Sequence, residues 1–447
     1  MKVSPRLFAA SSLATIFFAG LVVAKDNRPG PIPDRLRAEG KIDKFYQKHV
    51  DAGGLPVVGS ERISDNALAE AAWIVGRMLD GRDDILQAMR QSRVRVAVMA
   101  ADEYTTDLPE HGRLKPKLFW DRRARGLGAT PTNPVVSCGE ENLLGFRRDP
   151  YPNENIFVHE FAHAIHGTGL NRVDPTFDRR LRAAFAAAND RGLWKNTYAA
   201  TNHSEYWAEG VQSWFDDNAP PDALHNDVRT RTRLKEYDPE LAKLCGEVFG
   251  DRAWRYKRPA ERKPEDRAHL VGYDPKTLPR FRWREAPLVD HPRVTVQTAA
   301  GDIELELDAK GAPEATKRFL KIANDGGYHS GRFDRATTTA RAEEKEMAGG
   351  WIGASVNPAW KEKWSKELEL PDLPLSANQP ESGTIAMTGD ADGFKIFVGS
   401  LPLEKVSCVP FGRVIVGADV ARKILAAPTD VGAIKAPIDV RRVIRKE

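Results

Sequence analysis

The chain has 447 residues, which is too many for one ordinary core, so two folded domains are expected. Hydrophobic residues make up 41% and charged residues 29%, as is usual for a globular chain. The 67 basic and 63 acidic residues leave a formal net charge of +4. This near balance gives no electrostatic reason to expect a nucleic acid as a partner.

The first residues have the pattern of a secretory signal peptide. Lys2 and Arg6 precede an apolar stretch that ends at Ala24, where small residues suit a signal peptidase. The sequence therefore predicts a signal over residues 1–24 and a secreted or periplasmic protein. The length of the apolar stretch leaves an uncleaved anchor as the alternative. No later segment is long and apolar enough to span a membrane, so no span is expected after signal removal.

The chain contains three cysteines, Cys138, Cys245 and Cys408. An odd number in an exported chain allows one disulfide and one free thiol. Cys138 and Cys245 lie in the same expected domain, so a disulfide is expected between them. The absence of a CxxC pair argues against a cysteine-based zinc or redox site.

After the signal, the spacing of apolar residues is mostly helical, up to a Pro- and Arg-rich segment that predicts a linker. The expected elements are helices over 65–79, 83–89, 155–166, 177–188 and 204–215, a buried strand over 94–100 and the linker over 256–292.

Beyond this segment the pattern changes to the alternation that is typical of strands. The boundary predicts a first domain over 25–287, with the linker at its end, and a second domain over 288–447. Within the second domain we expect strands over 293–298, 303–307, 383–387, 395–398, 412–416 and 440–444, and a helix over 313–324.

The sequence His159-Glu160-Phe161-Ala162-His163 is an HExxH motif within an expected helix. On a helix, histidines four residues apart share one face, so both imidazoles can bind one ion. Zn²⁺ accepts such ligands and keeps a position for water, from which Glu160 can take a proton. The surrounding residues are almost all apolar and predict a buried helix, whose polar side chains need partners. A core helix whose polar side chains are hydrogen-bonded is the alternative.

A third metal ligand must come from another segment. The metzincin pattern would place Gly at position 166 and His at position 169, but the sequence has His166 and Gly169. His166 is therefore interpreted as a core or rim histidine and not as a ligand. Glu205 and Glu209 lie four residues apart beside the core face of the next long helix. One of them can bind zinc while the other orients a ligating histidine.

The HEFAH motif, followed by Tyr198 and the block Glu205-Tyr206-Trp207-Ala208-Glu209, resembles the catalytic domain of anthrax lethal factor-like metallopeptidases, which are gluzincins. The resemblance implies a zincin-like domain that is mainly α (α+β). It implies Glu205 as the third zinc ligand and Glu209 as its neighbour outside the ligand set. It also implies that Tyr198 hydrogen-bonds the oxyanion of the tetrahedral intermediate. Glu209 as the ligand and Tyr198 as an ordinary loop residue remain the alternatives.

The second domain contains motifs in the order and spacing of another family. These include Gly301-Asp302-Ile303-Glu304-Leu305, Phe333-Asp334-Arg335, Gly383-Thr384-Ile385-Ala386-Met387 and Phe411-Gly412-Arg413-Val414-Ile415. They resemble a cyclophilin-type peptidyl-prolyl isomerase. The resemblance implies an all-β closed barrel of eight strands with a helix at each end.

The same resemblance implies a proline-binding pocket with Arg335 and Phe397 in it. An arginine near the prolyl nitrogen can weaken the double-bond character of the amide. Other pocket positions depart from the family pattern, with Ala348 and Lys395 in place of glutamines, Leu403 near a tryptophan position and Cys408 near a histidine position. Weak isomerase activity, and a barrel that only binds proline-containing peptides or is structural, both stay open.

The sequence thus predicts a multidomain protein with a zincin-like domain and a cyclophilin-like barrel. The expected function is a secreted zinc metalloendopeptidase that hydrolyses peptides or proteins, including proline-containing ones. Zn²⁺ is the expected cofactor. A secreted prolyl isomerase or folding factor with an accessory zinc domain is one alternative. A non-catalytic peptide-binding protein with a structural zinc is the other.

Overall fold

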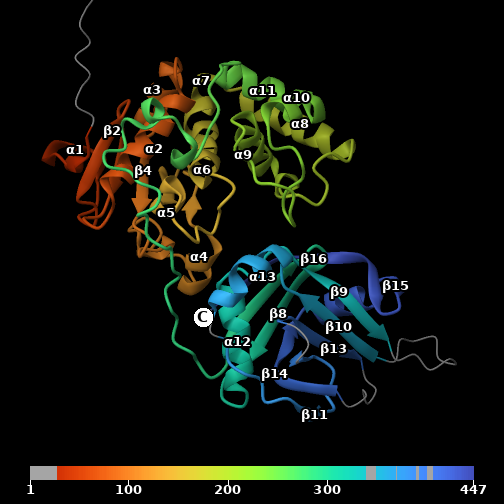
Figure 1. The fold of residues 1–447 in the computed structure, drawn as a ribbon. Coiled ribbons are helices and arrows are strands. Elements are labelled where there is room, and N and C mark those ends of the chain that lie inside the picture. Colours follow the sequence, from red (N-terminus) through yellow and green to blue (C-terminus); the bar gives the residue numbers. More distant parts are fainter. Residues whose placement is uncertain (1–27, 339–348, 369, 389–391, 400–405, 447) are drawn as a thin grey trace, which may run out of the picture.

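The computed structural model describes residues 28–446 except 339–348, 369, 389–391 and 400–405. It has two domains, an amino-terminal sheet-and-helix domain (residues 28–287) and a barrel domain (residues 293–446) (Figure 1). Their main hydrophobic cores are separate clusters of buried residues. The expected signal over 1–24, as well as Ala348 and Leu403, lie outside the described residues. Among the described residues, no helix is both long and apolar enough to cross a membrane.

The amino-terminal domain is built on a sheet of six strands, of which the sequence predicted one. The three central strands are parallel and the outer ones antiparallel, in the order β1-β2-β3-β4-β6-β5. The unpredicted strands are short, and the buried ones show continuous apolar runs without alternation. The strands are β1 (Gly30–Pro31), β2 (Lys48–Ala52), β3 (Leu55–Gly59), β4 (Arg95–Met99), β5 (Gly126–Leu127) and β6 (Val135–Gly139).

Helices pack around this sheet, and the expected long helices are all present. The α-helices described in this domain, expected or not, are α1 (Asp34–Gly40), α2 (Asp65–Met78), α3 (Asp83–Gln91), α4 (Lys117–Arg123), α5 (Glu140–Leu144), α6 (Ile156–Ala164), α7 (Asn171–Val173), α8 (Phe177–Asp190), α9 (His203–Trp214), α10 (Arg231–Tyr237) and α11 (Pro239–Phe249).

Helices α6 and α9 lie against each other and carry the motifs singled out above. Asn155 caps α6, since its side chain accepts hydrogen bonds from the backbone N–H groups of Phe157 and Val158. Asn202 caps α9 in the same way. The expected helix over 155–166 ends as an α-helix at Ala164 and continues as a π-helical segment (Ile165–Leu170). The two caps fix where each helix begins and therefore which residues face the partner helix.

The expected disulfide between Cys138 and Cys245 is wrong for this structure, where all three cysteines are free and buried. Cys138 lies within β6, opposite Val98 of β4, while Cys245 lies on α11. The two thiols thus belong to different parts of the core. Burial raises the pKa of both thiols, which keeps them protonated and unreactive.

The expected linker over 256–292 is mostly a packed part of the amino-terminal domain. Arg262 forms a buried ion pair with Glu70 of α2, with Nη1 and Oε2 2.9 Å apart. The Tyr273 hydroxyl donates to the Leu144 carbonyl at 2.9 Å. Arg262, one of the arginines that made the composition look linker-like, is thus a buried contact, whereas Arg282 and Arg284 are exposed. The segment contains two short 3₁₀ turns, Pro259–Glu261 and Pro264–Arg267.

A second buried ion pair stabilises the sheet next to α6. Arg125 donates to Glu141 from Nε at 2.6 Å and from Nη2 at 2.9 Å, and neither side chain is exposed. Because Glu141→Ala leaves the guanidinium buried without its counter-charge, we expect the free energy of unfolding to fall by about 3–5 kcal/mol. Urea denaturation measures this loss.

The matched control is Asp227→Ala, which breaks the exposed Arg233–Asp227 pair (Nε to Oδ2, 2.9 Å). That change is expected to cost less than about 1 kcal/mol. Equal costs for the two variants would contradict a stabilising role of the buried pair.

The second domain is the expected closed barrel. Its eight strands are antiparallel to their neighbours in the order β8-β7-β16-β9-β10-β13-β12-β14, and the pairing of β14 with β8 closes the ring. The barrel strands are β7 (Arg293–Thr298), β8 (Gly301–Leu307), β9 (Gly331–Thr338), β10 (Gly349–Ser355), β12 (Thr384–Thr388), β13 (Phe394–Gly399), β14 (Val406–Val416) and β16 (Ala433–Arg445).

Among the described residues, two short strands, three α-helices and a 3₁₀ turn (Ser365–Glu367) complete this domain. Helix α12 packs against β14 and β16, while α14 packs against β8, β9, β10 and β13. The additional elements are β11 (Ser376–Asn378), β15 (Thr429–Asp430), α12 (Pro313–Asn324), α13 (Pro358–Trp364) and α14 (Ala418–Leu425).

The two domains meet where α4 lies on β16 (Figure 1). Arg442 of β16 donates from Nη1 to the carbonyl of Arg123, the last residue of α4, at 2.8 Å. Arg148 and Asp325 form an ion pair across the junction, with Nη1 and Oδ2 3.2 Å apart. Between the domains lies a cavity of about 1530 Å³. The barrel therefore forms one wall of a space that also borders the amino-terminal domain.

Candidate functional site

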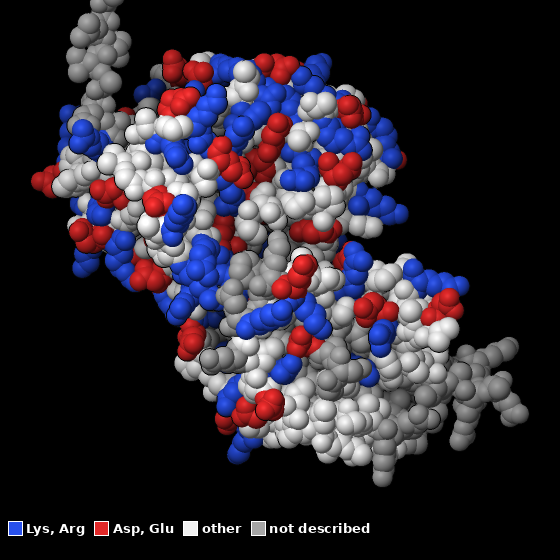
Figure 2. All heavy atoms as spheres, in the orientation of Figure 1, with Lys and Arg blue, Asp and Glu red and all other residues white. Residues whose placement is uncertain are grey.

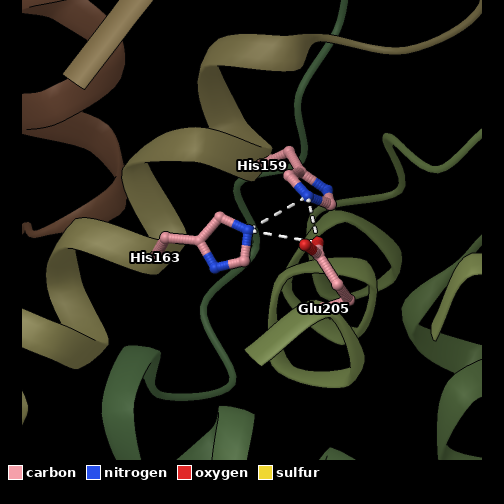
Figure 3. A group of neighbouring side chains, drawn as sticks. All are labelled: His159, His163 and Glu205. Carbon is pink, nitrogen blue, oxygen red and sulfur yellow. Dashed lines mark hydrogen bonds and ion pairs between the residues drawn. The ribbon is translucent and has the colours of Figure 1, made fainter. Parts of the chain in front are cut away.

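Helices α6 and α9 bring His159, His163 and Glu205 together (Figure 3). The Nε2 atoms of the two histidines are 3.2 Å apart. Glu205 Oε2 lies 3.0 Å from the first Nε2 and 3.2 Å from the second. Among the described residues, this trio is the only group of three or more such side chains close enough to hold one metal ion.

The trio fits a zinc ion. Ligand atoms about 2.0–2.1 Å from a tetrahedral zinc lie about 3.3 Å from one another, close to the three separations observed. The remaining ring nitrogens also have partners: His159 Nδ1 lies 2.8 Å from Gln212 Oε1, and His163 Nδ1 lies 2.9 Å from Ser204 Oγ. These contacts direct both Nε2 atoms toward Glu205, as is usual around protein-bound metals.

Glu209 lies behind the trio and not in it. Its Oε1 is 3.5 Å from His159 Nδ1, and its Oε2 accepts from Asn218 Nδ2 at 3.1 Å. His225 approaches the same carboxylate, with Nε2 and Oε2 3.8 Å apart. Burial lowers the pKa of His225, but the carboxylates of Glu209 and Asp222 outweigh burial and hold it at about 9. The structure thus brings Glu205, not Glu209, to the two Nε2 atoms.

Glu160 and Tyr198 line the cleft beside the trio, which has a volume of about 570 Å³. Burial raises the pKa of the Glu160 carboxyl, while the neighbouring histidines oppose this rise. Tyr198 lies on a 3₁₀ turn just before α9, and its ring centroid is 6.1 Å from that of His159. Its hydroxyl oxygen accepts a hydrogen bond from Arg123 Nη2 at 3.4 Å. A carboxylate and a hydroxyl group therefore share one cleft with the trio.

His166 is held apart from the trio. It is buried, and its Nε2 lies 3.1 Å from Asp178 Oδ1. Burial lowers the pKa of its imidazole to about 4, although Asp178 opposes this. His166 thus occupies the core position expected for it.

Four residues in the cleft or in contact with the trio were missed by sequence reasoning. Gln212 lies two turns after Glu205 on α9, so helical spacing is a signal that could have found it. Ser204 directly precedes Glu205, and its hydroxyl contacts His163. Arg123 and His225 come from distant segments, and no spacing rule connects them to the HExxH motif.

The two residues expected in the barrel pocket differ in their burial. Phe397 of β13 is fully buried and packs with Ala386 and Cys408, while Arg335 of β9 is exposed. Lys395 Nζ lies 4.1 Å from the ring centroid of Trp351, on the neighbouring strand β10. The lysine that replaces a glutamine of the family pattern therefore stacks on an aromatic ring beside Phe397.

The barrel segment matches a known family. Residues 293–445 match the family model for cyclophilin-type peptidyl-prolyl cis-trans isomerases. These residues form a cyclophilin-type domain. The expected barrel is confirmed for this part of the chain by the match and by the eight-stranded ring.

Curated relatives of the cyclophilin-type domain carry the same family name. Peptidyl-prolyl cis-trans isomerase-like 1 of Homo sapiens is 28% identical over 160 residues, which are 34% of this chain and 90% of the relative. Peptidyl-prolyl cis-trans isomerase cypE of Dictyostelium discoideum is 28% identical over 152 residues, 34% of this chain and 94% of the relative. A Cryptosporidium parvum cyclophilin crystal structure has a TM-score of 0.27 at 19% identity, covering 35% of this chain and 98% of that one.

Proposed function

We propose that the amino-terminal domain is a zinc-dependent metallopeptidase. The observation that carries this proposal is the convergence of His159, His163 and Glu205 within the span of one tetrahedral ion. When bound there, zinc would polarise the scissile carbonyl and acidify a water molecule. The cleft beside the trio, of about 570 Å³, shares lining residues with the larger cavity between the domains.

The other cleft residues have roles in this proposal that follow from their positions. Glu160 accepts the proton of the attacking water and returns it to the leaving amine, which balances the hydrolysis. Arg123 donates to the Tyr198 oxygen, so the hydroxyl proton of Tyr198 stays free to point at the oxyanion. Gln212 and Ser204 hold the two imidazoles in place.

The proposal is tested by measuring bound metal in the purified full-length chain and cleavage of a mixed peptide library by the same sample. We expect about one zinc per chain and new peptide termini that a chelator prevents. A chain that binds no zinc, or that binds zinc and cleaves nothing, would remove the metallopeptidase proposal. The second of these results would favour a structural zinc in a peptide-binding protein.

We also propose that residues 1–24 direct the chain to a secreted or periplasmic location. This proposal rests on the charged start, the apolar stretch and Ala24. Mass spectrometry of the mature protein is expected to find Lys25 at the amino terminus. A mature chain that retains residues 1–24 would indicate an anchor instead.

The second candidate function is prolyl isomerisation by the cyclophilin-type domain. The family match of residues 293–445 favours it, and the exposed side chain of Arg335 on β9 is open to a peptide. The two candidate functions of the chain differ in which domain is catalytic. Under this candidate the chain is a folding factor, and the metal domain is an accessory.

Arg335→Ala is expected to slow catalysed cis-trans exchange of an Xaa-Pro peptide by about tenfold or more, because the guanidinium no longer donates near the prolyl nitrogen. NMR exchange spectroscopy on the full-length chain measures the rate. The control Arg413→Gln changes an exposed arginine on β14 and is expected to keep the parent rate. If the parent exchanges the peptide no faster than buffer does, the barrel is not an isomerase.

A further inference from the structure

The cleft around the metal trio continues into the space between the domains. The cleft is lined by Glu160 and the trio, and the larger cavity lies between the barrel and the amino-terminal domain. Five residues line both spaces: Tyr151, Glu154, Leu224, His225 and Arg442. A peptide that occupies both spaces therefore passes Arg442, which belongs to the barrel.

Several charged groups of this cleft already have a partner. Asp178 binds Arg182, with Oδ2 and Nε 2.7 Å apart. Glu154 accepts a hydrogen bond from Gln212 Nε2 at 3.0 Å. Glu205 lies with the two histidines. These three carboxylates are thus engaged before any substrate arrives.

Arg123 and Arg442 differ from these paired groups, because neither arginine forms an ion pair in the described part of the chain. Arg123 is half-buried, and its side chain donates to the neutral hydroxyl of Tyr198. It interacts electrostatically with Glu160 but without an ion pair. Arg442 is also half-buried; it donates one N–H to a backbone carbonyl and lies 6.0 Å from the ring centroid of Tyr151. Two partly desolvated guanidinium groups that lack an ion-pair partner can gain one from an anionic ligand.

Lys and Arg side chains also gather at the junction of the domains on the face drawn in Figure 2. The wall of the interdomain cavity includes several arginines, among them Arg122, Arg148 and Arg332. The same wall also carries acidic side chains, and two of them, Asp325 and Asp439, pair with Arg148 and Arg332. The attraction for an anionic group of a substrate therefore depends on the individual arginines beside the cleft and not on the wall as a whole.

We propose that Arg123 and Arg442 together form a carboxylate-binding subsite beside the metal centre, with one arginine from each domain. The guanidinium fork matches a carboxylate in geometry and charge. The carboxylate belongs either to the chain end of the peptide or to an acidic side chain. This inference rests on the proposed metallopeptidase function and names its substrate class. It also gives the cyclophilin-type domain a role in substrate selection that is independent of its own pocket.

The test measures binding, so that it does not depend on hydrolysis. The background is the zinc-loaded full-length Glu160→Gln chain. The probes are fluorescein-Ala-Phe-Gly-Leu with a free carboxyl end, the same peptide as an amide, and fluorescein-Ala-Phe-Gly-Glu as an amide. Fluorescence anisotropy gives each dissociation constant. We expect the first amide to bind about ten- to hundredfold more weakly than the acid, the loss of one charge-assisted contact. If the Glu amide regains the affinity, the subsite takes side chains as well.

Arg123→Gln and Arg442→Gln are each expected to reduce the ratio of acid to amide affinity to near one. Damage to the fold would weaken acid and amide alike and leave their ratio unchanged. Arg442→Lys keeps the charge without the fork and is expected to give an intermediate ratio. The control Arg413→Gln is expected to keep the parent ratio.

Three results would overturn the subsite: equal binding of all three peptides, no measurable binding, or a ratio that survives both glutamine substitutions. In the last case the carboxylate binds the metal itself. If the wild-type chain hydrolyses peptides but does not distinguish the acid from the amide, the subsite proposal is wrong and the metallopeptidase proposal is supported. If the chain distinguishes the acid from the amide but hydrolyses no peptide, the subsite proposal is supported and the metallopeptidase proposal is wrong.

Discussion

Replacing Glu160 with Gln is expected to slow peptide hydrolysis by about 10²–10⁴-fold while zinc stays bound. Glutamine has nearly the same shape and keeps the α6 packing, but its amide cannot accept the proton of the attacking water. Since Glu160 lies outside the trio, the metal content of the variant should equal that of the parent. The measurement pairs the hydrolysis rate with zinc per chain.

Glu247→Gln serves as the matched control, because it makes the same chemical change on α11, where Glu247 pairs with Arg180 at the surface. It is expected to keep both the rate and the metal. Hydrolysis that persists at the parent rate in the Glu160 variant would show that this carboxylate is not the base. Loss of both zinc and hydrolysis would mean that it belongs to the ligand set.

The second large effect is expected from His163→Ala. Removing one of three ligands leaves an imidazole and a carboxylate, which are too few to hold zinc against dilution. Zinc per chain should fall from about one to near zero, and hydrolysis should be lost with it. Because zinc binds only the folded chain, zinc at 100 times its dissociation constant should stabilise the parent by about 2.7 kcal/mol and the variant hardly at all.

His166→Ala provides the comparison that separates a ligand from a nearby histidine. His166 lies one turn further along, outside the trio and next to Asp178. Its variant is expected to keep zinc, even if packing is weakened. Zinc loss from the folded His166 variant together with retention by the His163 variant would reverse the assignment.

Local rules predicted the helices that carry the site. The HExxH spacing puts two histidines on one face, and Asn155 and Asn202 are the capping residues that start α6 and α9. The contact of Glu205 with the histidines depends on how α9 docks on α6. The choice of Glu205 as the ligand came from a family resemblance, because Glu205 and Glu209 are equivalent by helical spacing alone.

Features that depend on distant packing were not predictable. The strands of the first sheet are too short to show a period, and the composition of residues 256–292 looked like a linker although Arg262 is buried against Glu70. The disulfide was inferred from domain membership, which says nothing about the distance between two thiols. Arg442 lines the cleft because β16 packs against α4, a contact between distant segments that the sequence does not specify.

For the barrel, the fold could be predicted from the sequence but the pocket could not. Its motifs occur in family order, so the sequence predicted the closed ring, and the family match confirms this for residues 293–445. The pocket could not be judged in the same way. Burial of Phe397 and the stacking of Lys395 on Trp351 depend on side-chain packing, which motif order does not specify.

The most direct test of the metallopeptidase proposal is a zinc titration of the chelator-treated full-length chain, with the initial rate of peptide hydrolysis as the readout. The rate is expected to rise in proportion to bound zinc and to stop rising at one zinc per chain. Hydrolysis at full rate before zinc is added, or none at one zinc per chain, would contradict a metallopeptidase centred on His159, His163 and Glu205.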